Sequence, residues 1–214
     1  MAIKLYSYWR SSAAYRVRLA LNLKGLEFET ISVSLAPGKS EHRQDDFRSR
    51  NPQMLVPFLE DGEFGAGQSQ AILEYLEETC PEPALLPSSA EQRAAVRSFS
   101  SSICCDIHPL NNLRVLLYLQ GELDVTDEQR NTWYAHWIHE GFRAAEITAT
   151  ACDGPFVFGE SASFADTCLI PQMYNARRYK VPLDDFPRLV AIEKHCNGLS
   201  AFQDALPENQ PDCV

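Results

Sequence analysis

The spacing of apolar positions changes within the first part of the chain. Ile3–Tyr8 is typical of a short β-strand, whereas the apolar residues of Ala13–Leu21 recur every three to four positions, which predicts a helix. Ser11 and Ser12 lie between them and are good N-cap residues. The unpaired N–H groups at a helix N-terminus favour an anion. The two hydroxyls could therefore bind a thiolate, carboxylate or phosphate, or could simply cap the helix.

Short strands and helices alternate over residues 1 to about 83. Gly25 ends the first predicted helix, and Phe28–Val33 is expected to form a second strand. Asp61-Gly62 separates two short apolar runs and is a strong hairpin signal. Gln68 and Ser69 then precede another amphipathic stretch, with Ser69 as the expected helix cap. The order βαβ, loop, ββα predicts a small mixed sheet with helices on its faces.

Pro57 stands at the start of the third predicted strand, directly after Val56. A trans proline at the edge of a sheet is the commoner arrangement. A cis Val56-Pro57 bond is the alternative, and it would turn the backbone of Val56 outward.

A proline-rich linker is predicted between Cys80 and Pro87, and the remaining chain has a helical pattern. One long helix is expected to run from the region of Val96 towards Leu117, with a kink at Pro109. A second helix is expected after the cap residue Thr126. Its apolar positions recur every four residues and are Trp133, Trp137, Gly141 and Ala145.

Further helices are expected after Ser163 and from Pro187 onward. Ser163 and Asp166 form a capping-box pattern, which indicates a role in stability rather than chemistry. The tail Pro207–Val214 is polar and is expected to be loosely held. We therefore predict an α+β fold with a mixed domain at residues 1–83 and an all-helical domain at residues 84–214.

The formal net charge of −10 argues against sequence-independent binding to nucleic acid or anionic membranes. No transmembrane span or signal peptide is recognisable, so we expect a cytoplasmic protein. The seven cysteines have neither disulfide-framework nor zinc-ribbon spacing, and they are expected to be reduced thiols. His136 and His139 lack a third ligand, so no metal site is predicted.

Several motifs resemble the zeta class of the cytosolic glutathione transferases, in the right order and over essentially the whole chain. They are Ser11-Ser12 followed by Arg16-Val17-Arg18, Asn51-Pro52, Val56-Pro57, Gln68-Ser69 with Ala71-Ile72, Ile107-His108-Pro109-Leu110-Asn111-Asn112-Leu113, and Gln210-Pro211-Asp212. The resemblance implies a thioredoxin-like glutathione-binding domain, an all-helical substrate-binding domain and a homodimer. It also implies glutathione as the cofactor.

The activity implied by this resemblance is cis–trans isomerisation of maleylacetoacetate in tyrosine and phenylalanine breakdown. Maleylpyruvate isomerisation, general conjugation of electrophiles and a non-catalytic binding module remain alternatives. The class usually reads Ser-Ser-Cys where this chain has Ala13 in the third position. We therefore expect the thiol of glutathione to be the nucleophile and Ser11 or Ser12 to activate it.

The resemblance also implies residues that hold glutathione. Gln68 and Ser69 match the site for its γ-glutamyl end, and the backbone of Val56 matches the position that pairs with its cysteinyl unit. His42 stands where relatives often carry Gln and could reach the glycine end, or could be a solvated loop residue. His108 and Asn112, four apart on the predicted helix, could orient glutathione or the enolate, or His108 could be a packing residue.

A small dicarboxylate substrate requires cations near its carboxylates. Arg10 adjoins the nucleophile turn, Arg114 follows Asn112 by two residues, and Arg178 lies in a segment that resembles a substrate-binding segment of the family. The alternative for each of these arginines is a solvated surface position without a role in binding.

Overall fold

The computed structural model describes residues 3–213. Contacts within the chain divide it into two compact units, one formed by residues up to Leu85 together with those from Asn197 onward, the other by Leu86–Cys196. The first unit contains a mixed sheet with helices, and the second is helical. The predicted fold class is therefore confirmed.

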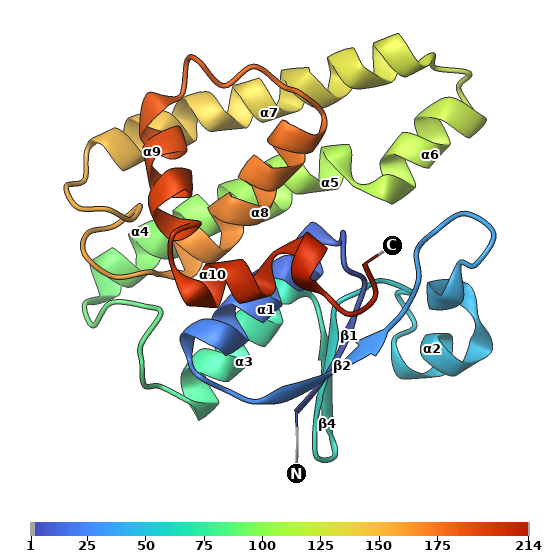
Figure 1. Cartoon of the computed structure of the whole chain (residues 1–214), viewed down its shortest axis with the longest axis horizontal. Coiled ribbons are helices and arrows are strands. Elements are labelled where there is room, and N and C mark those ends of the chain that lie inside the picture. The colour runs from blue at the N-terminus through green and yellow to red at the C-terminus, as the bar shows by residue number, and fades with distance from the viewer. Residues whose placement is uncertain (1–2, 214) are drawn as a thin grey trace. The chain divides into compact units, whose positions relative to one another are not determined.

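Four strands form the sheet in the order β2-β1-β3-β4 (Figure 1). The strands are β1 (Ile3–Ser7), β2 (Phe28–Ser32), β3 (Phe58–Asp61) and β4 (Phe64–Gly67). Strand β1 is parallel to β2 and antiparallel to β3, and β3 is antiparallel to β4. The predicted hairpin is present, but its turn is Gly62-Glu63 because Asp61 still pairs with Phe64. Gly62 has φ +63°, which explains the glycine there.

Helices α1 (Ser12–Leu23) and α3 (Ser69–Thr79) pack against each other in the first unit (Figure 1). Helix α1 forms where the sequence predicts it, and Val17, Ala20 and Leu21 are fully buried, whereas Ala13 is half-buried. The helix is not buried on one face only, because all residues from Ala14 to Leu21 are buried. Gly25 follows its end with φ +64°. A short 3-10 helix, η1 (Glu41–Arg43), and helix α2 (Asp45–Arg50) connect β2 to β3.

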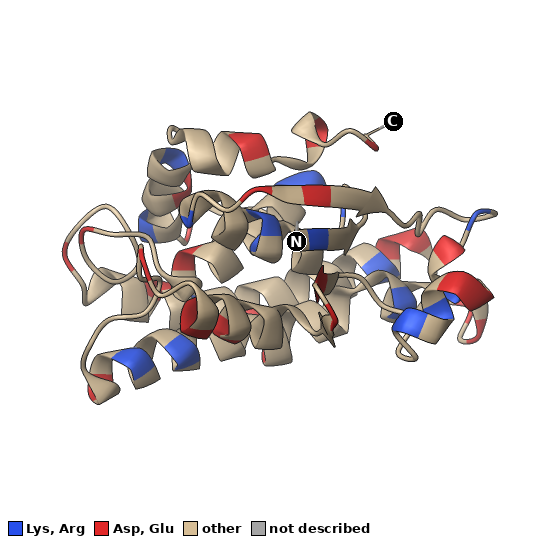
Figure 2. Cartoon of the chain, turned by 90° about the horizontal axis from the view of Figure 1, so that it is seen from below, with Lys and Arg blue, Asp and Glu red and all other residues tan. Residues whose placement is uncertain are grey.

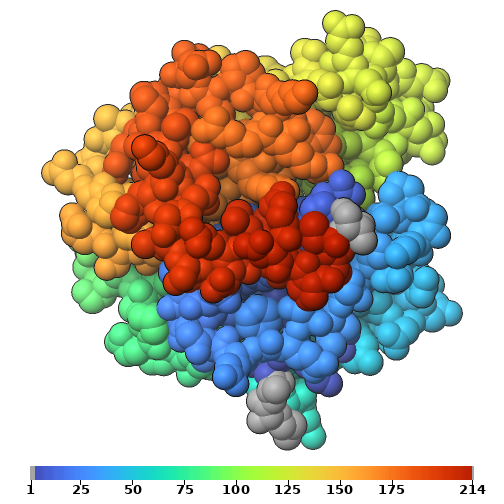
Figure 3. Space-filling model, viewed as in Figure 1, coloured from blue at the N-terminus to red at the C-terminus, as the bar shows by residue number. Residues whose placement is uncertain are grey.

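The C-terminal segment packs on α1 through α10 (Ser200–Ala205), which is followed by the 3-10 helix η3 (Pro207–Asn209), and its red surface lies against blue in Figure 3. Asp212 Oδ2 accepts hydrogen bonds from the backbone N–H of Trp9 at 3.0 Å and from Ser32 Oγ at 3.2 Å. The prediction of a loosely held tail is therefore wrong for residues 207–213, while Val214 lies outside the described residues.

The proline-rich stretch between Cys80 and Pro87 contains neither helix nor strand, as predicted. The first compact unit ends within it, at Leu85. The domain limits 1–83 and 84–214 themselves stay a prediction. The compact units differ from these limits at the C-terminal end, because residues from Asn197 onward belong to the first unit. There Arg18 Nε and Asn22 Nδ2 of α1 donate to backbone carbonyls of α10, at 3.1 and 3.0 Å.

The second unit begins with α4 (Ala90–Ser101), a π-helical turn η2 (Ser102–Ile107), α5 (His108–Asn111) and α6 (Leu113–Gly121). The predicted continuous helix is therefore wrong in detail, because it is interrupted at Asn112, which has extended backbone angles. The π-helical turn immediately precedes α5, which contains Pro109. Proline lacks the N–H that would bond to the carbonyl four residues earlier, which accounts for irregular helix at this place.

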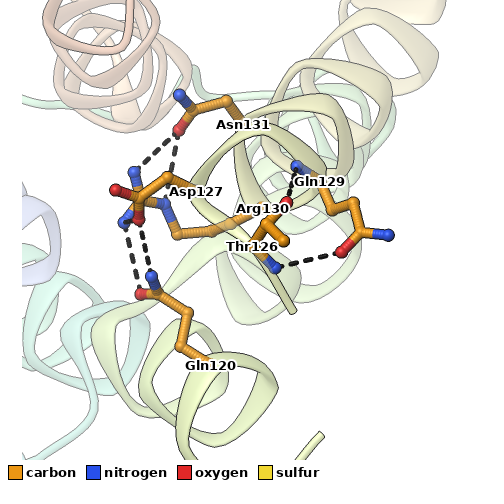
Figure 4. Close-up of polar contacts among 6 residues, drawn as sticks. All are labelled: Gln120, Thr126, Asp127, Gln129, Arg130 and Asn131. Carbon is orange, nitrogen blue, oxygen red and sulfur yellow. Dashed lines mark hydrogen bonds and ion pairs between the residues drawn. The ribbon is translucent and has the colours of Figure 1, made fainter. Parts of the chain in front are cut away.

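Helix α7 (Asp127–Thr150) starts with the predicted cap. Thr126 Oγ1 accepts from the N–H of Gln129, whose side chain accepts from the N–H of Thr126, and Arg130 forms an ion pair with Asp127 (Figure 4). The buried stripe lies partly one position beyond the predicted one. Its residues are Tyr134, Ile138, Phe142, Ala145 and Ala149, while Trp133, Trp137 and Gly141 are half-buried.

Helices α8 (Phe164–Arg178) and α9 (Pro187–Cys196) complete the second unit. The capping box of Ser163 and Asp166 is confirmed. The carboxylate of Asp166 accepts hydrogen bonds from the N–H groups of Val157 and Ser163 and from Ser163 Oγ. Burial nevertheless raises the pKa of Asp166, because desolvation outweighs these bonds.

Acidic and basic positions are interspersed along the ribbon in the view of Figure 2. Among the described residues, no helix is both long and apolar enough to cross a membrane.

Candidate functional site

The register of the sheet brings three turns of the first unit to one end of the strands. Tyr6 pairs with Phe58, and Phe58 pairs with Gly67. The turn after β1, the residues before β3 and the residues after β4 therefore lie side by side. These turns carry Ser11 and Ser12, Val56 and Pro57, and Gln68 and Ser69 respectively.

Ser11 is the N-cap of α1, and Ser12 is the first residue of the helix. Ser11 Oγ accepts from the backbone N–H of Ala14 at 3.2 Å, which confirms the predicted cap. The hydroxyl proton of Ser11 is not used by this bond and can be donated to an anion in front of the helix. Ser12 is buried, with only 8% of its surface exposed.

The turn after β4 differs from the prediction for Ser69. Gln68, with φ +66°, occupies the N-cap position of α3 and makes no side-chain cap bond. Ser69 is instead the first residue of the helix, and its Oγ accepts from Arg16 Nη1 at 3.2 Å. The expected cap is wrong because the left-handed backbone of Gln68 moves the helix start by one residue. The exposed side chain of Gln68 donates to Gln53 Oε1 at 2.7 Å.

The turn before β3 contains the cis bond between Val56 and Pro57, so the alternative geometry is the one present. Val56 is buried. Its backbone N–H and C=O make no hydrogen bond within residues 3–213, so both groups can pair with an extended peptide.

His42 lies in η1, in the connection that follows β2. Glu41 anchors this connection, since its carboxylate accepts from the N–H of Ser34 at 2.7 Å and its own N–H donates to the Ser34 carbonyl. Burial lowers the pKa of His42, and the backbone contact to Ser34 offsets part of this effect. His42 is therefore held mainly as the neutral imidazole near neutral pH.

Arg10 lies in the turn between β1 and α1. Its guanidinium is stacked 4.7 Å from the ring centroid of Trp9, and its Nη2 donates to Tyr8 Oη at 3.1 Å. No carboxylate forms an ion pair with Arg10 within the part of the chain that the structure describes. Its charge is therefore available for an anionic ligand.

The remaining predicted residues belong to the second unit. His108 begins α5, whereas Asn112 lies outside any helix and caps α6, its Oδ1 accepting from the N–H of Val115 at 3.0 Å. The expected spacing of one regular helical turn between His108 and Asn112 is therefore wrong. The physical reason is that the Asn112 side chain starts a new helix, which requires extended backbone at that residue.

Arg114 and Arg178 are both exposed, on α6 and at the end of α8. The guanidinium of Arg178 lies 5.2 Å from the ring centroid of Tyr179, and its neighbour Arg177 is occupied by an ion pair with Glu193 at 2.8 Å. Neither Arg114 nor Arg178 forms an ion pair among the residues described. No group of three or more potential metal-binding His, Cys, Asp or Glu residues is found in the same part of the chain.

Two residues at the site were not singled out as site residues from the sequence. Gln53 holds the side chain of Gln68, and Arg16 reaches Ser69 from α1. Arg16 could have been recognised because it belongs to the motif Arg16-Val17-Arg18, which has no role assigned from the sequence. Gln53 has no comparable signal, since it is one of several polar residues in a loop.

Comparison with known proteins identifies the relatives of this chain. Residues 1–78 match the family model for the glutathione S-transferase N-terminal domain. A probable maleylacetoacetate isomerase of Vibrio cholerae is 46% identical over 212 residues, which cover 99% of this chain and 99% of that protein.

Solved structures agree with this result. The holo structure of a maleylpyruvate isomerase, described as a bacterial zeta-class glutathione S-transferase, is 43% identical with a TM-score of 0.96, covering 99% of this chain and 100% of that one. A maleylacetoacetate isomerase of Anaeromyxobacter dehalogenans with glutathione bound in its active site is 39% identical, with a TM-score of 0.88, covering 100% and 98%.

Proposed function

The chain belongs to the zeta class of the glutathione transferase family, and from this membership we propose that it is a glutathione-dependent maleylacetoacetate isomerase. The observation that supports this proposal most directly is the position of Ser11 at the N-terminus of α1, beside the turns that carry Val56 and Ser69. The sequence similarity to a probable maleylacetoacetate isomerase supports it as well.

The reaction requires rotation about a carbon–carbon double bond, which is prohibitively slow while the bond is intact. The thiolate of glutathione adds to one alkene carbon, and the electron pair of the double bond moves onto the conjugated carbonyl as an enolate. The former double bond is then single and rotates. Collapse of the enolate reforms the double bond in the trans geometry and expels the thiolate, so glutathione is regenerated.

The enzyme must stabilise the thiolate, since a free thiol with a pKa of about 8.5 is mostly protonated at neutral pH. The N-terminus of α1 contributes about 0.3–1 kcal/mol, and up to about 2 where partly buried. A hydrogen bond from the Ser11 hydroxyl to the charged sulfur contributes about 1.5–3 kcal/mol. Because each pKa unit corresponds to about 1.4 kcal/mol, these two effects suffice without a cysteine at Ala13. Ser12 is the second candidate for the hydroxyl.

Glutathione is held, in this proposal, by groups of the first unit that are available for it. Ser69 and the first N–H groups of α3 receive the γ-glutamyl carboxylate, with the amide of Gln68 beside them. The backbone of Val56 pairs with the cysteinyl unit, and His42 reaches the glycine end. His108 and Asn112 are assigned to glutathione or the enolate by the family motif alone.

Recognition of the dicarboxylate is assigned to Arg10, Arg114 and Arg178. The absence of ion pairs to these arginines within residues 3–213 supports the assignment, since each guanidinium is free to form a charge-assisted bond with a carboxylate. A homodimer is proposed on family grounds. We propose the cytoplasm as the location, in keeping with seven cysteines that form no disulfide.

Maleylpyruvate is the second candidate substrate, because the structurally similar holo enzyme is a maleylpyruvate isomerase. The two substrates are distinguished by measuring kcat/KM for each with saturating glutathione, using a coupled hydrolase for the trans product. The proposal predicts the larger value for maleylacetoacetate. A larger value for maleylpyruvate would retain the mechanism but reject the proposed substrate.

A further inference from the structure

Arg16 is a buried charge that the proposed reaction leaves unexplained. It lies on α1 and is 2% exposed. Its Nη1 donates to Ser69 Oγ at 3.2 Å, whereas Nε and Nη2 have no hydrogen-bond partner among the described residues. No carboxylate in that part of the chain forms an ion pair with it.

Arg18, two residues further along the same helix, shows what a structural arginine looks like here. It is 1% exposed, and each of its three nitrogens donates a hydrogen bond, to Ala205 O, Ser7 Oγ and Trp9 O. A buried guanidinium without such partners is unfavourable, because the cost of removing it from water is not offset. Arg16 therefore reduces the stability of the ligand-free protein unless something else compensates its charge.

The neighbourhood of Arg16 is arranged for an anion. Helix α3 has eleven residues, no acidic residue in its first turn and no side-chain cap bond. Its first N–H groups therefore retain their partial positive charge. Because Ser69 Oγ accepts from Arg16, the hydroxyl proton of Ser69 is directed away from the guanidinium and can be donated to a ligand.

We propose that Arg16 is a positioning residue for the γ-glutamyl α-carboxylate of glutathione. It orients the Ser69 hydroxyl as a donor, and the ligand's carboxylate supplies the counter-charge that the protein lacks. Arg16 acts through Ser69, because its own nitrogens are buried. The inference rests on the proposed glutathione site, and it assigns a role to the first arginine of Arg16-Val17-Arg18.

Binding is tested by calorimetry with two ligands, glutathione and its analogue in which the γ-glutamyl α-carboxylate is an amide. For Arg16→Met we expect the Kd of glutathione to rise about tenfold, the equivalent of about 1.4 kcal/mol, and the Kd of the amide to stay the same. Arg16→Lys keeps the charge and should recover part of the affinity. In turnover, Arg16→Met should raise the KM for glutathione with little change in kcat.

Thermal unfolding without ligand separates positioning from structure. Arg16→Met should unfold at a temperature equal to or above that of the wild type, because an unpaired buried charge is removed. Arg18→Met, the matched control, should unfold at a lower temperature, because it breaks three hydrogen bonds. Glutathione should raise the unfolding temperature less for Arg16→Met than for the wild type.

The inference would be overturned if Arg16→Met changed the Kd values of glutathione and of the amide equally, or left the Kd of glutathione unchanged. It would also be overturned if the Arg16→Met protein were too unstable to purify while Arg16→Lys bound both ligands with wild-type affinities. Failure of the proposed function is a separate result, namely a wild-type protein that binds glutathione but does not isomerise. Absence of glutathione binding to the wild type would overturn both.

Discussion

The hydroxyl of Ser11 serves both the helix and the proposed chemistry. Its oxygen accepts the cap bond from Ala14, and its proton is left for the sulfur of glutathione. An oxygen can accept and donate at the same time, so neither role excludes the other. The sequence could predict the cap from residue type, but it could not predict which serine faces outward, because that depends on where the helix starts.

Replacement of Ser11 by alanine separates these roles. The bond to the thiolate is worth about 1.5–3 kcal/mol, so the pKa of bound glutathione should rise by about one to two units and kcat at neutral pH should fall at least tenfold. The ultraviolet absorbance of the thiolate, followed against pH, measures the pKa. Stability should fall by about 0.5–2 kcal/mol from loss of the cap.

Thr126→Ala is the matched control, because Thr126 is also an N-cap and lies in the second unit, on α7. It should cost a similar free energy of unfolding without a change in the thiol pKa. A Ser11→Ala enzyme with an unchanged thiol pKa and rate would assign the activation to Ser12.

His42 gives a prediction on pH. Its pKa is lowered from the ordinary value of 6.5, mainly by burial, so the folded protein favours the neutral form. The unfolded chain then takes up the proton first, and the contribution of His42 to stability is lost as the pH falls from 6.5 through the lower folded value. A carboxylate of the ligand beside His42 would raise its pKa again.

Binding of S-methylglutathione, which has no thiol proton, should therefore take up protons just below pH 6.5. Calorimetry in two buffers of different ionisation enthalpy measures this uptake, and His42→Gln should abolish it. The same uptake in His42→Gln and in the wild type would show that His42 does not contact the glycine carboxylate.

For the helices and strands, the sequence predicts helix ends where the local chemistry of a cap residue decides. Thr126 and Ser163 start helices as expected, and Gly25 follows the end of another. The left-handed Gln68 and the break at Asn112 were not predictable, because neither residue type forbids a regular helix. The shift of the buried stripe on α7 reflects packing against neighbouring helices, which periodicity within one helix does not reveal.

The contact of α7 with η2 depends on the absence of a side chain at Gly141. A Cβ atom there would lie 2.2 Å from Ile107 Cδ1 and 2.3 Å from Cγ1. Gly141→Ala should therefore lower the free energy of unfolding by about 1–3 kcal/mol, despite the better helix propensity of alanine. Denaturant unfolding measures the change.

Gly121→Ala is the control for propensity, because a Cβ at the end of α6 would meet nothing within 4 Å. It should be neutral or stabilising. The combination of Gly141→Ala with Ile107→Ala should cost less than the sum of the two single changes. Strict additivity would show that no clash exists at this contact.

At the scale of the whole molecule, the motifs identified the class, the cofactor and the order of the two parts of the chain. The association of the C-terminal segment with α1 was not predicted, since it depends on contacts such as Asp212 with Trp9, far apart in sequence. The polar composition of the segment after Pro207 predicts only that its residues are exposed to solvent. The contact of Arg16 with Ser69 is also long-range, and it connects a motif of unassigned role to the proposed glutathione site.

In the proposed isomerisation, glutathione is used and returned. The most direct measurement follows maleylacetoacetate through a coupled hydrolase with and without glutathione, and determines glutathione by thiol titration before and after many turnovers. We expect turnover only with glutathione, and full recovery of the thiol. If maleylacetoacetate is not isomerised and the thiol is instead consumed by a generic electrophile, the protein is a conjugating transferase and not an isomerase.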